Sequence, residues 1–299
     1  MSAAVVRLPD VPPRARRVAI GTFDGVHLGH REVIRGADTV LTFHPHPVAV
    51  VRPEAAPRLL TTLERKARLV GELGVEELVV IPFDAEFSSQ AAEQFVEDVL
   101  VGRLGATHVA VGENFRFGQR AQGTPEMLAA DPRFETRVVP LLEVDGEVVS
   151  SSHIRGLIAG GAVHYAGELL GSPFVMQGPV AHGDKRGRTL GFPTANLVPR
   201  DGYLVPAHGV YACEVTLADG SKHAAATNVG VRPQFNTGRG ELVEAYLIDW
   251  SGDIYGEPIE VAFIKRLRGE KRFASVDALL EQMAKDVEQA RAATLRDRP

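Results

Sequence analysis

Short apolar runs alternate with helix-like segments through the first half of the chain. The runs lie at residues 18–21, 39–43, 78–83, 107–111 and 138–142. Each is a nearly continuous aliphatic stretch, which is typical of a strand buried on both faces of a parallel sheet. This half therefore predicts an α/β domain over residues 16–168, after a loose, Pro-rich lead at residues 1–15.

The pattern changes in the second half of the chain. Short alternating runs, separated by Gly and Pro turns, lie at residues 174–176, 209–217, 223–229, 243–248 and 259–264. Such spacing predicts an antiparallel barrel or sandwich over residues 172–299, with the domain boundary between residues 168 and 172. Ser275 is expected to cap a final helix at 276–295 that packs on this barrel.

Two helix starts are predicted within the first domain. Thr61 with Glu64 forms the pattern of a capping box, and the helix that follows ends at Gly74. Ser88 and Ser89 are expected to cap a second helix. The apolar positions that this second helix turns toward the core are Phe95, Val96, Val99 and Leu100.

Composition and charge are those of an ordinary globular protein of about two domains. The 299 residues are 44% hydrophobic and 24% charged, with a net charge of −5, which disfavours partnership with nucleic acid or an anionic membrane surface. No apolar run reaches transmembrane length. Cys213 is the single cysteine, which excludes an intrachain disulfide and suits a reducing cytoplasm. The arginines at 14, 16 and 17 predict a solvated entry to the first strand.

A glycine turn and two histidines follow the first strand, between Gly21 and His30. α/β proteins bind phosphates where a strand is followed by a glycine turn and the start of a helix. His27 and His30 are three residues apart, so both rings face one side of a helix, and Gly29 leaves room for a ligand. They can donate to phosphate oxygens in a transition state. A zinc pair and a purely structural pair are the competing interpretations.

Two later segments of this domain also offer phosphate ligands. The loop from Gly112 to Gly118 follows a strand, and its Asn114 can bind phosphate or ribose. The aromatic pair Phe115 and Phe117 suits either the core or a flavin-stacking surface. The segment 150–155 presents hydroxyls and a cation at a helix start, with Arg155 as a plain surface residue the alternative.

In the second domain the run from Gly187 to Asn196 has the most distinctive chemistry. Its glycines allow close backbone approach to a ligand, and Pro193 fixes the chain before Thr194. In an extended segment Thr194 and Asn196 face the same side, where a hydroxyl and an amide oxygen suit Mg²⁺ held together with phosphate. A turn that simply enters a strand is the alternative.

Glu244 lies further on, in an alternating strand at residues 241–247. A carboxylate beside a substrate hydroxyl can accept its proton during phosphoryl transfer. The competing interpretation is a strand glutamate that faces solvent.

Taken together, these segments resemble the bacterial bifunctional riboflavin kinase/FMN adenylyltransferase family, over roughly residues 17 to 290. The segments that carry the resemblance are 21–30, 42–47, 111–118, 150–155, 187–196, 227–233 and 267–273. The resemblance implies a Rossmann-like nucleotidylyltransferase domain of the HxGH type, followed by a riboflavin kinase β-barrel with a terminal helix. Two features depart from the family: the segment between His30 and Thr42 is short, and His44 stands where the family has Asp.

The resemblance also implies residue roles. His27, His30 and Glu244 are implied to be catalytic, and Thr194 and Asn196 to hold Mg²⁺. Contacts to ATP and its phosphates are implied for Gly21, Phe23, Asp24, Gly29, Asn114, Ser151, Ser152, Arg155, Gly183, Lys185, Gly187 and Arg188. Contacts to flavin are implied for Phe115, Asn228, Arg232 and Phe273.

The expected function is synthesis of flavin cofactors in the cytoplasm: riboflavin is phosphorylated to FMN, and FMN is adenylylated to FAD, each with ATP. The expected partners are these small molecules, with no nucleic acid or membrane. Two alternatives remain open. The chain could act as a riboflavin kinase alone, with a degenerate or retuned first domain, or as a non-catalytic flavin-binding regulator.

Overall fold

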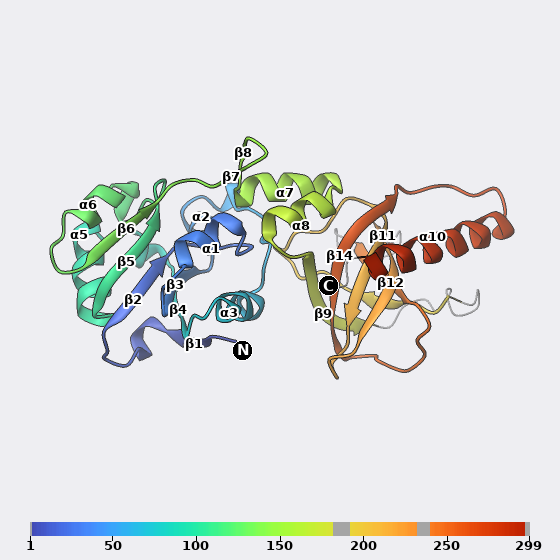
Figure 1. Ribbon diagram of the computed structural model, residues 1–299, viewed down its shortest axis with the longest axis horizontal. Coiled ribbons are helices and arrows are strands. Elements are labelled where there is room, and N and C mark those ends of the chain that lie inside the picture. Colours follow the sequence, from blue (N-terminus) through green and yellow to red (C-terminus); the bar gives the residue numbers. More distant parts are fainter. Residues whose placement is uncertain (1, 182–191, 232–239, 297–299) are drawn as a thin grey trace. The chain divides into compact units, whose positions relative to one another are not determined.

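The structure is a computed structural model that describes residues 2–181, 192–231 and 240–296. Packing divides the chain into two compact units, residues 1–151 and 152–299 (Figure 1). The elements of the first unit are β1 (Ala4–Arg7), β2 (Arg16–Ile20), α1 (Leu28–Ile34), β3 (Thr39–His44), α2 (Pro47–Val51), α3 (Leu63–Glu72), β4 (Glu77–Pro82), α4 (Ala85–Ser88), α5 (Ala92–Gln94), a π-helix (Phe95–Arg103), β5 (Ala106–Gly112), α6 (Pro125–Ala129), β6 (Glu135–Val139), β7 (Glu143–Val144) and β8 (Glu147–Val148).

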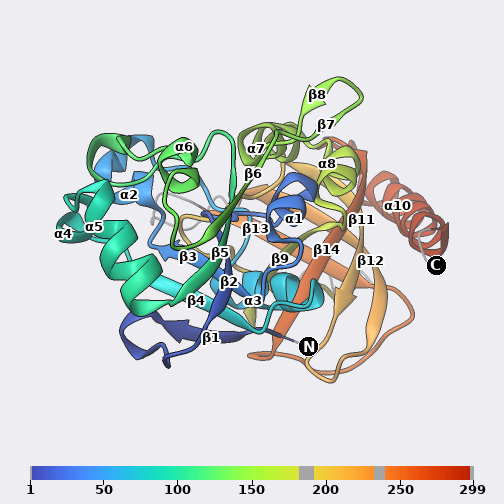
Figure 2. The same ribbon diagram turned by 60° about the vertical axis from the view of Figure 1, so that its left-hand side comes forward.

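The first unit is built on a six-stranded parallel sheet in the order β1-β4-β3-β2-β5-β6 (Figure 2). The chain runs outward from β2 through β3 to β4, and then returns to add β5 on the other side of β2. The direction of winding therefore reverses between β2 and β5. In open α/β sheets ligands bind at such a reversal, outside the carboxyl ends of the strands.

Alternate residues of the strands enter two separate hydrophobic cores. Val18 and Ile20 of β2 pack in one core with the π-helix, whereas Ala19 packs in the other with α1 and α3. Both faces of the sheet are covered, which explains why the strands are continuous apolar runs. The expected α/β class is confirmed.

The short connection between β2 and β3 is compensated by a second helix. Helix α1 has seven residues and buries only Val33 and Ile34. Ala67, Leu69 and Val70 of α3 join them in the same core. The two helices together cover a face that α1 alone is too short to shield from water.

Several local predictions for this unit were wrong. The lead at 1–15 contains β1, which pairs with β4 at the sheet edge; only four residues form it, so its pattern is weak. Arg16 is 1% exposed, not solvated. The last strand is Glu135–Val139, three residues earlier than the apolar run at 138–142 indicates.

The expected caps were also wrong. Thr62, not Thr61, caps α3 by accepting a hydrogen bond from the Arg65 N–H. Ser88 and Ser89 lie at the end of α4, and the next helix begins after Ala91, whose N–H donates to the Gln94 side chain. The apolar positions that follow are buried as predicted. The capping patterns therefore indicated that a helix follows, but they did not identify the residue at which each helix begins.

The second unit is a closed antiparallel barrel with helices against it. Its elements are α7 (Ser151–Gly160), α8 (Val163–Leu170), β9 (Phe174–Ala181), β10 (Ala195–Leu197), β11 (Gly209–Thr216), β12 (Lys222–Val231), β13 (Glu241–Leu247), β14 (Pro258–Arg268) and α10 (Val276–Arg296). The strands close in the order β10-β13-β12-β11-β14-β9. Helix α8 packs on β9 and β14. The packing thus places α7 and α8 with the barrel, whereas the sequence indicated a boundary between residues 168 and 172.

The terminal helix packs on the outer face of the barrel, as predicted. Ser275 caps α10 by accepting a hydrogen bond from the Ala278 N–H. Ala290 is buried against Ala212 and Ile248 in a small cluster. A polar pair fixes the helix as well: the Arg268 guanidinium of β14 donates to both carboxylate oxygens of Asp286, which is 3% exposed.

Arg16 gives a test of the first unit's stability. Its guanidinium donates to Glu77 at 3.0 Å and to the carbonyls of Pro12, Arg14 and Leu104. Arg16→Met leaves these acceptors without their donor, so we expect a loss of about 3 kcal/mol in unfolding free energy. Urea unfolding followed by circular dichroism measures this loss, with the exposed Arg103→Met as a control that changes it by less than about 0.5 kcal/mol.

The same experiment shows which unit is affected. The only tryptophan, Trp250, lies in the second unit, so its fluorescence reports the barrel. The transition seen by Trp250 should be the same in Arg16→Met and the wild type. An unchanged circular-dichroism transition in Arg16→Met would contradict the assigned role of this buried cation.

Candidate active sites

His27 and His30 stand together at the start of α1. His27 is the N-cap, and its Nδ1 accepts a hydrogen bond from the His30 N–H at 3.2 Å. The two rings stack, with centroids 3.5 Å apart and planes 18° apart. Because Nδ1 is an acceptor, a neutral His27 carries its proton on Nε2, which is then a donor. Both rings therefore lie on the same side of the helix start, as their three-residue spacing predicts.

The loop before these histidines has an unusual backbone. Phe23 and Val26 have φ of 46° and 44°, in the left-handed region that non-glycine residues rarely adopt. The Phe23 ring is 2% exposed and meets the His30 ring edge-on at 5.3 Å. A Cβ on Gly29 would come within 3.3 Å of the His27 ring. The loop shapes the position of both imidazoles.

Asp24 is turned into the protein in this structure. Its carboxylate is 2% exposed and accepts hydrogen bonds from the backbone N–H groups of Leu60 and Thr61. Thr61 Oγ1 also accepts from the Gly25 N–H, so it supports this loop and does not cap α3. The local geometry thus gives Asp24 a role in anchoring the loop.

The loop after β5 lies beside the histidine loop in the sheet order. Asn114 is exposed there. Phe117 is buried in the core with Phe95, and the half-buried Phe115 stacks on it with centroids 5.6 Å apart. Phe117 therefore belongs to the core, and the half-buried Phe115 packs against it.

The segment 150–155 begins α7. Ser151, the last residue of the first unit, donates through Oγ to the Asp24 carbonyl of the histidine loop at 2.8 Å. Ser152 is exposed and Arg155 is half-buried on the first turn of α7.

His44 occupies the last position of β3, at the carboxyl edge of the sheet. It is exposed, and its carbonyl accepts a hydrogen bond from the Phe83 N–H at 3.0 Å. The family departure at this position thus lies on the surface and not in the core.

In the barrel, three strands bring polar side chains into one row. Asn196 of β10 pairs with Glu244 of β13, and Glu244 pairs with Asn228 of β12. Side chains directly opposite one another in antiparallel strands are close neighbours on one face. Tyr246, two residues beyond Glu244 in β13, packs in the cluster that contains Ala290 of α10, so the row lies on the outer face of the barrel and Ala195 and Ala245 point inward.

Aromatic packing fixes the segment before this row. Phe192 meets Tyr246 edge-on at 5.1 Å, and Tyr246 is two residues beyond Glu244 on the same outer face. Asn196 is 4% exposed and donates through Nδ2 to the Thr194 carbonyl at 3.4 Å. This bond turns the amide nitrogen toward the backbone and orients the oxygen. The set of a threonine hydroxyl, an amide oxygen and a nearby carboxylate fits Mg²⁺.

The end of β14 approaches the other end of the row. Arg268 lies over the Phe273 ring at 5.8 Å while it is held by Asp286. A Cβ on Gly230 would come within 3.1 Å of Glu270 Oε1, so the segment after β14 lies close to β12. Glu270 thus lies beside the strand that carries Asn228, and Phe273 packs against Arg268.

Five of the predicted site residues lie outside the described residues: Gly183, Lys185, Gly187, Arg188 and Arg232. Among the residues that are described, no three His, Cys, Asp or Glu side chains gather as metal ligands would. The residue that sequence reasoning missed is Lys66, which is buried beneath the histidine loop. The sequence shows only a lysine on the side of an amphipathic helix that faces the core, which does not by itself indicate a function.

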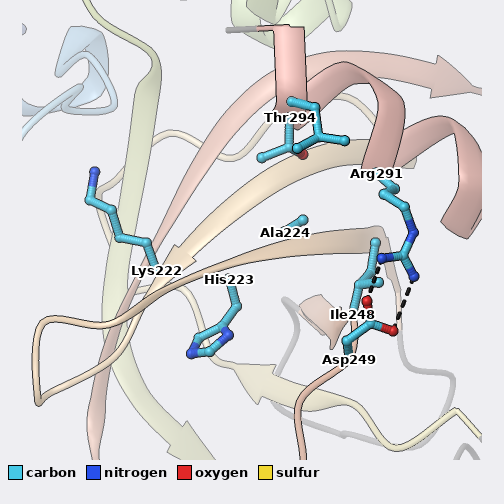
Figure 3. Close-up of a pocket in the computed structure, with 8 residues that line it drawn as sticks. Lys222, His223, Ala224, Ile248, Asp249, Arg291 and Thr294 are labelled. Atoms are coloured by element: carbon cyan, nitrogen blue, oxygen red, sulfur yellow. Dashed lines mark hydrogen bonds and ion pairs between the residues drawn. The ribbon is translucent and has the colours of Figure 1, made fainter. Parts of the chain in front are cut away.

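A shallow hollow of about 260 Å³ lies elsewhere on the barrel, between β12 and α10 (Figure 3). Its lining residues are Lys222, His223, Ala224, Ile248, Asp249, Arg291, Thr294 and Leu295. Arg291 is paired with Asp249 and Lys222 with Glu214 at 2.8 Å, so both cations are engaged. None of the predicted site residues lines this hollow.

Comparisons with known proteins agree with this geometry. A family model described as FAD synthetase matches residues 11–153, and one described as riboflavin kinase matches residues 170–294. The bifunctional riboflavin kinase/FMN adenylyltransferase of Bacillus subtilis is 38% identical over 289 residues, covering 91% of this chain and 90% of that protein. The Escherichia coli K12 protein of the same name is 36% identical over 292 residues, covering 93% of each chain.

The architecture also occurs in a solved structure. A Streptococcus pneumoniae protein described as a macrolide-efflux protein is 32% identical, with a TM-score of 0.87, and the match covers 96% of this chain and 98% of that one. In the described part of this chain, no helix is long and apolar enough to span a membrane. With two family models matched in order, and relatives at least 36% identical over at least 90% of both chains, this chain belongs to the bifunctional riboflavin kinase/FMN adenylyltransferase family.

Proposed function

We propose that this chain makes flavin cofactors in two ATP-dependent steps, one in each unit. The barrel phosphorylates riboflavin to FMN, and the α/β unit adenylylates FMN to FAD with release of pyrophosphate. The observation that carries the proposal is the register row Asn196–Glu244–Asn228 on a riboflavin kinase barrel, in the same chain as a paired His27 and His30. A single buried cysteine and ATP as substrate support a cytoplasmic location.

In the kinase step, the terminal hydroxyl of riboflavin attacks the γ-phosphate of ATP. Glu244 orients this hydroxyl and accepts its proton. Asn228 and Phe273 line the flavin. Thr194 and Asn196 hold Mg²⁺, which when bound neutralises charge that develops on the phosphates. The segment 183–188 is proposed to cover those phosphates, and Arg232 to contact the flavin.

In the adenylyltransferase step, the phosphate of FMN attacks the α-phosphate of ATP. His27 and His30 donate to phosphate oxygens as negative charge builds in the transition state. Gly21, Phe23 and Gly29 shape the loop against the nucleotide. Further contacts to ATP are proposed for Asn114, Ser151, Ser152 and Arg155, and a flavin contact for Phe115. No protein nucleophile is required, because the two substrates react directly once they are positioned.

One assay tests the whole proposal. Purified chain is incubated with riboflavin, ATP and Mg²⁺, and the flavins are separated by chromatography. Formation of FAD supports both steps. FMN that accumulates without conversion to FAD would show that the chain acts as a riboflavin kinase alone. Riboflavin that stays unchanged would favour a non-catalytic flavin-binding regulator.

His30→Ala should separate the two activities. Loss of a donor to the transition-state charge is expected to lower FAD formation by at least about 100-fold, while FMN still accumulates. His164→Ala is the control and should leave both rates unchanged, because the His164 side chain is 63% exposed. Undiminished FAD formation by His30→Ala would refute the role of this ring.

Glu244→Gln should have the opposite effect. The amide keeps the shape of the side chain but cannot accept a proton, so riboflavin phosphorylation is expected to fall by at least about 100-fold. Added FMN should still be converted to FAD. Glu214→Gln, in β11 of the same barrel, is the matched control. A Glu244→Gln chain with full kinase activity would show that Glu244 is only a surface glutamate.

Asn196→Ala tests the magnesium ligands. Removing one oxygen ligand should raise the Mg²⁺ concentration for half-maximal kinase rate by about tenfold. The Mg²⁺ dependence of adenylylation should not change. Asn228→Ala, at the other end of the same row, is expected to raise the KM for riboflavin without altering the Mg²⁺ requirement. Equal Mg²⁺ dependence in Asn196→Ala and wild type would argue against a ligand at this position.

A further inference from the structure

Lys66 is the only lysine among the first 151 residues, which contain fifteen arginines. It lies in α3 with 8% of its surface exposed. A lysine differs from an arginine in presenting a compact point charge on a flexible stem. Such a group reaches a single buried acceptor where a planar guanidinium does not fit easily.

The ammonium of Lys66 donates to one carbonyl of the histidine loop. The distance from Nζ to the Thr22 carbonyl oxygen is 2.6 Å, and that from Nζ to Thr42 Oγ1 is 3.4 Å. Thr42 Oγ1 itself donates to the Thr22 carbonyl at 3.0 Å. One backbone oxygen is therefore held from α3 and from β3 at once.

Lys66 carries a charge in a buried position. Burial lowers the pKa of Lys66 to about 8, while the nearby Asp24 carboxylate favours the charged form. The side chain is thus mainly an ammonium at neutral pH. A buried charge is costly, and an apolar side chain of similar length would serve the packing of α3 as well. The ammonium is matched instead by a polar partner, the Thr22 carbonyl of the histidine loop.

The Thr22 carbonyl immediately precedes the left-handed Phe23, whose ring lies against His30. We propose that Lys66 is a positioning residue for adenylyl transfer: by fixing the Thr22 carbonyl, it holds Phe23 and thereby sets the His30 ring against the reacting phosphates. This inference rests on the proposed adenylyltransferase activity of the first unit. Lys66 acts through the loop and is not itself assigned a contact to substrate.

Lys66→Met tests the inference, because it keeps the length of the side chain and removes the donor. The measurement is the single-turnover rate of FAD formation from saturating FMN and ATP, since this rate constant does not depend on the folded fraction of the sample. We expect it to fall by about 10- to 100-fold, as small misplacements of catalytic groups do. ATP affinity should change by less than about threefold, and riboflavin phosphorylation should be unchanged.

Thr42→Val provides a second, milder variant that removes only the hydroxyl from the same carbonyl. It should lower the same rate constant by a few fold, and the double variant should lose less than the product of the two effects, because both act on one oxygen. Arg103→Met, an exposed cation in the same unit, is the control and should keep the wild-type rate.

Three outcomes would overturn the inference. A Lys66→Met chain with the wild-type single-turnover rate would show that the lysine serves stability only. If Lys66→Met fails to fold, a Thr42→Val chain with an undiminished rate would overturn the inference as well. A wild-type chain that forms FMN but no FAD would overturn the proposed adenylyltransferase activity itself, and the inference with it.

Discussion

Left-handed backbone at Phe23 and Val26 is the constraint on which the first site depends. Each such residue costs about 1–3 kcal/mol and persists only where the surroundings hold it firmly. Here the loop is held from several sides. Asp24 accepts hydrogen bonds from Leu60 and Thr61, and the Thr22 carbonyl accepts from Thr42. The strain is balanced by buried polar contacts, and its result is a fixed pair of imidazoles.

The second site depends on a different constraint, the register of an antiparallel barrel. Asn196, Glu244 and Asn228 lie in three different strands, with β10 distant in the sequence from the other two, and strand pairing brings them into one row. A shift of one residue in any strand would turn its polar side chain into the barrel interior. The small residues Ala195 and Ala245 fill that interior beside the row. Packing inside the barrel therefore determines the chemistry outside it.

These two constraints explain how much the sequence could predict. The continuous apolar runs identified the buried strands, and the spacing of His27 and His30 placed both rings on one side, because these features depend on local periodicity. The pairing of Glu244 with both asparagines could not be predicted, since register is set by long-range contacts. The cap expected at Thr61 and the solvated position expected for Arg16 were wrong for a related reason: burial of a polar side chain depends on partners such as the Gly25 N–H and the Leu104 carbonyl, which lie far away in the sequence.

Both departures from the pattern that the resemblance implies lie in the first unit. The short crossover reduces α1 to seven residues, but α3 supplies the missing cover and also brings Lys66 beneath the loop. His44 follows Thr42 by two residues in β3, so it faces the same side of the sheet, one step nearer its carboxyl edge. The imidazole there stands where the resemblance implies a carboxylate, at the edge of the sheet where the carboxyl ends of β2 and β5 also lie.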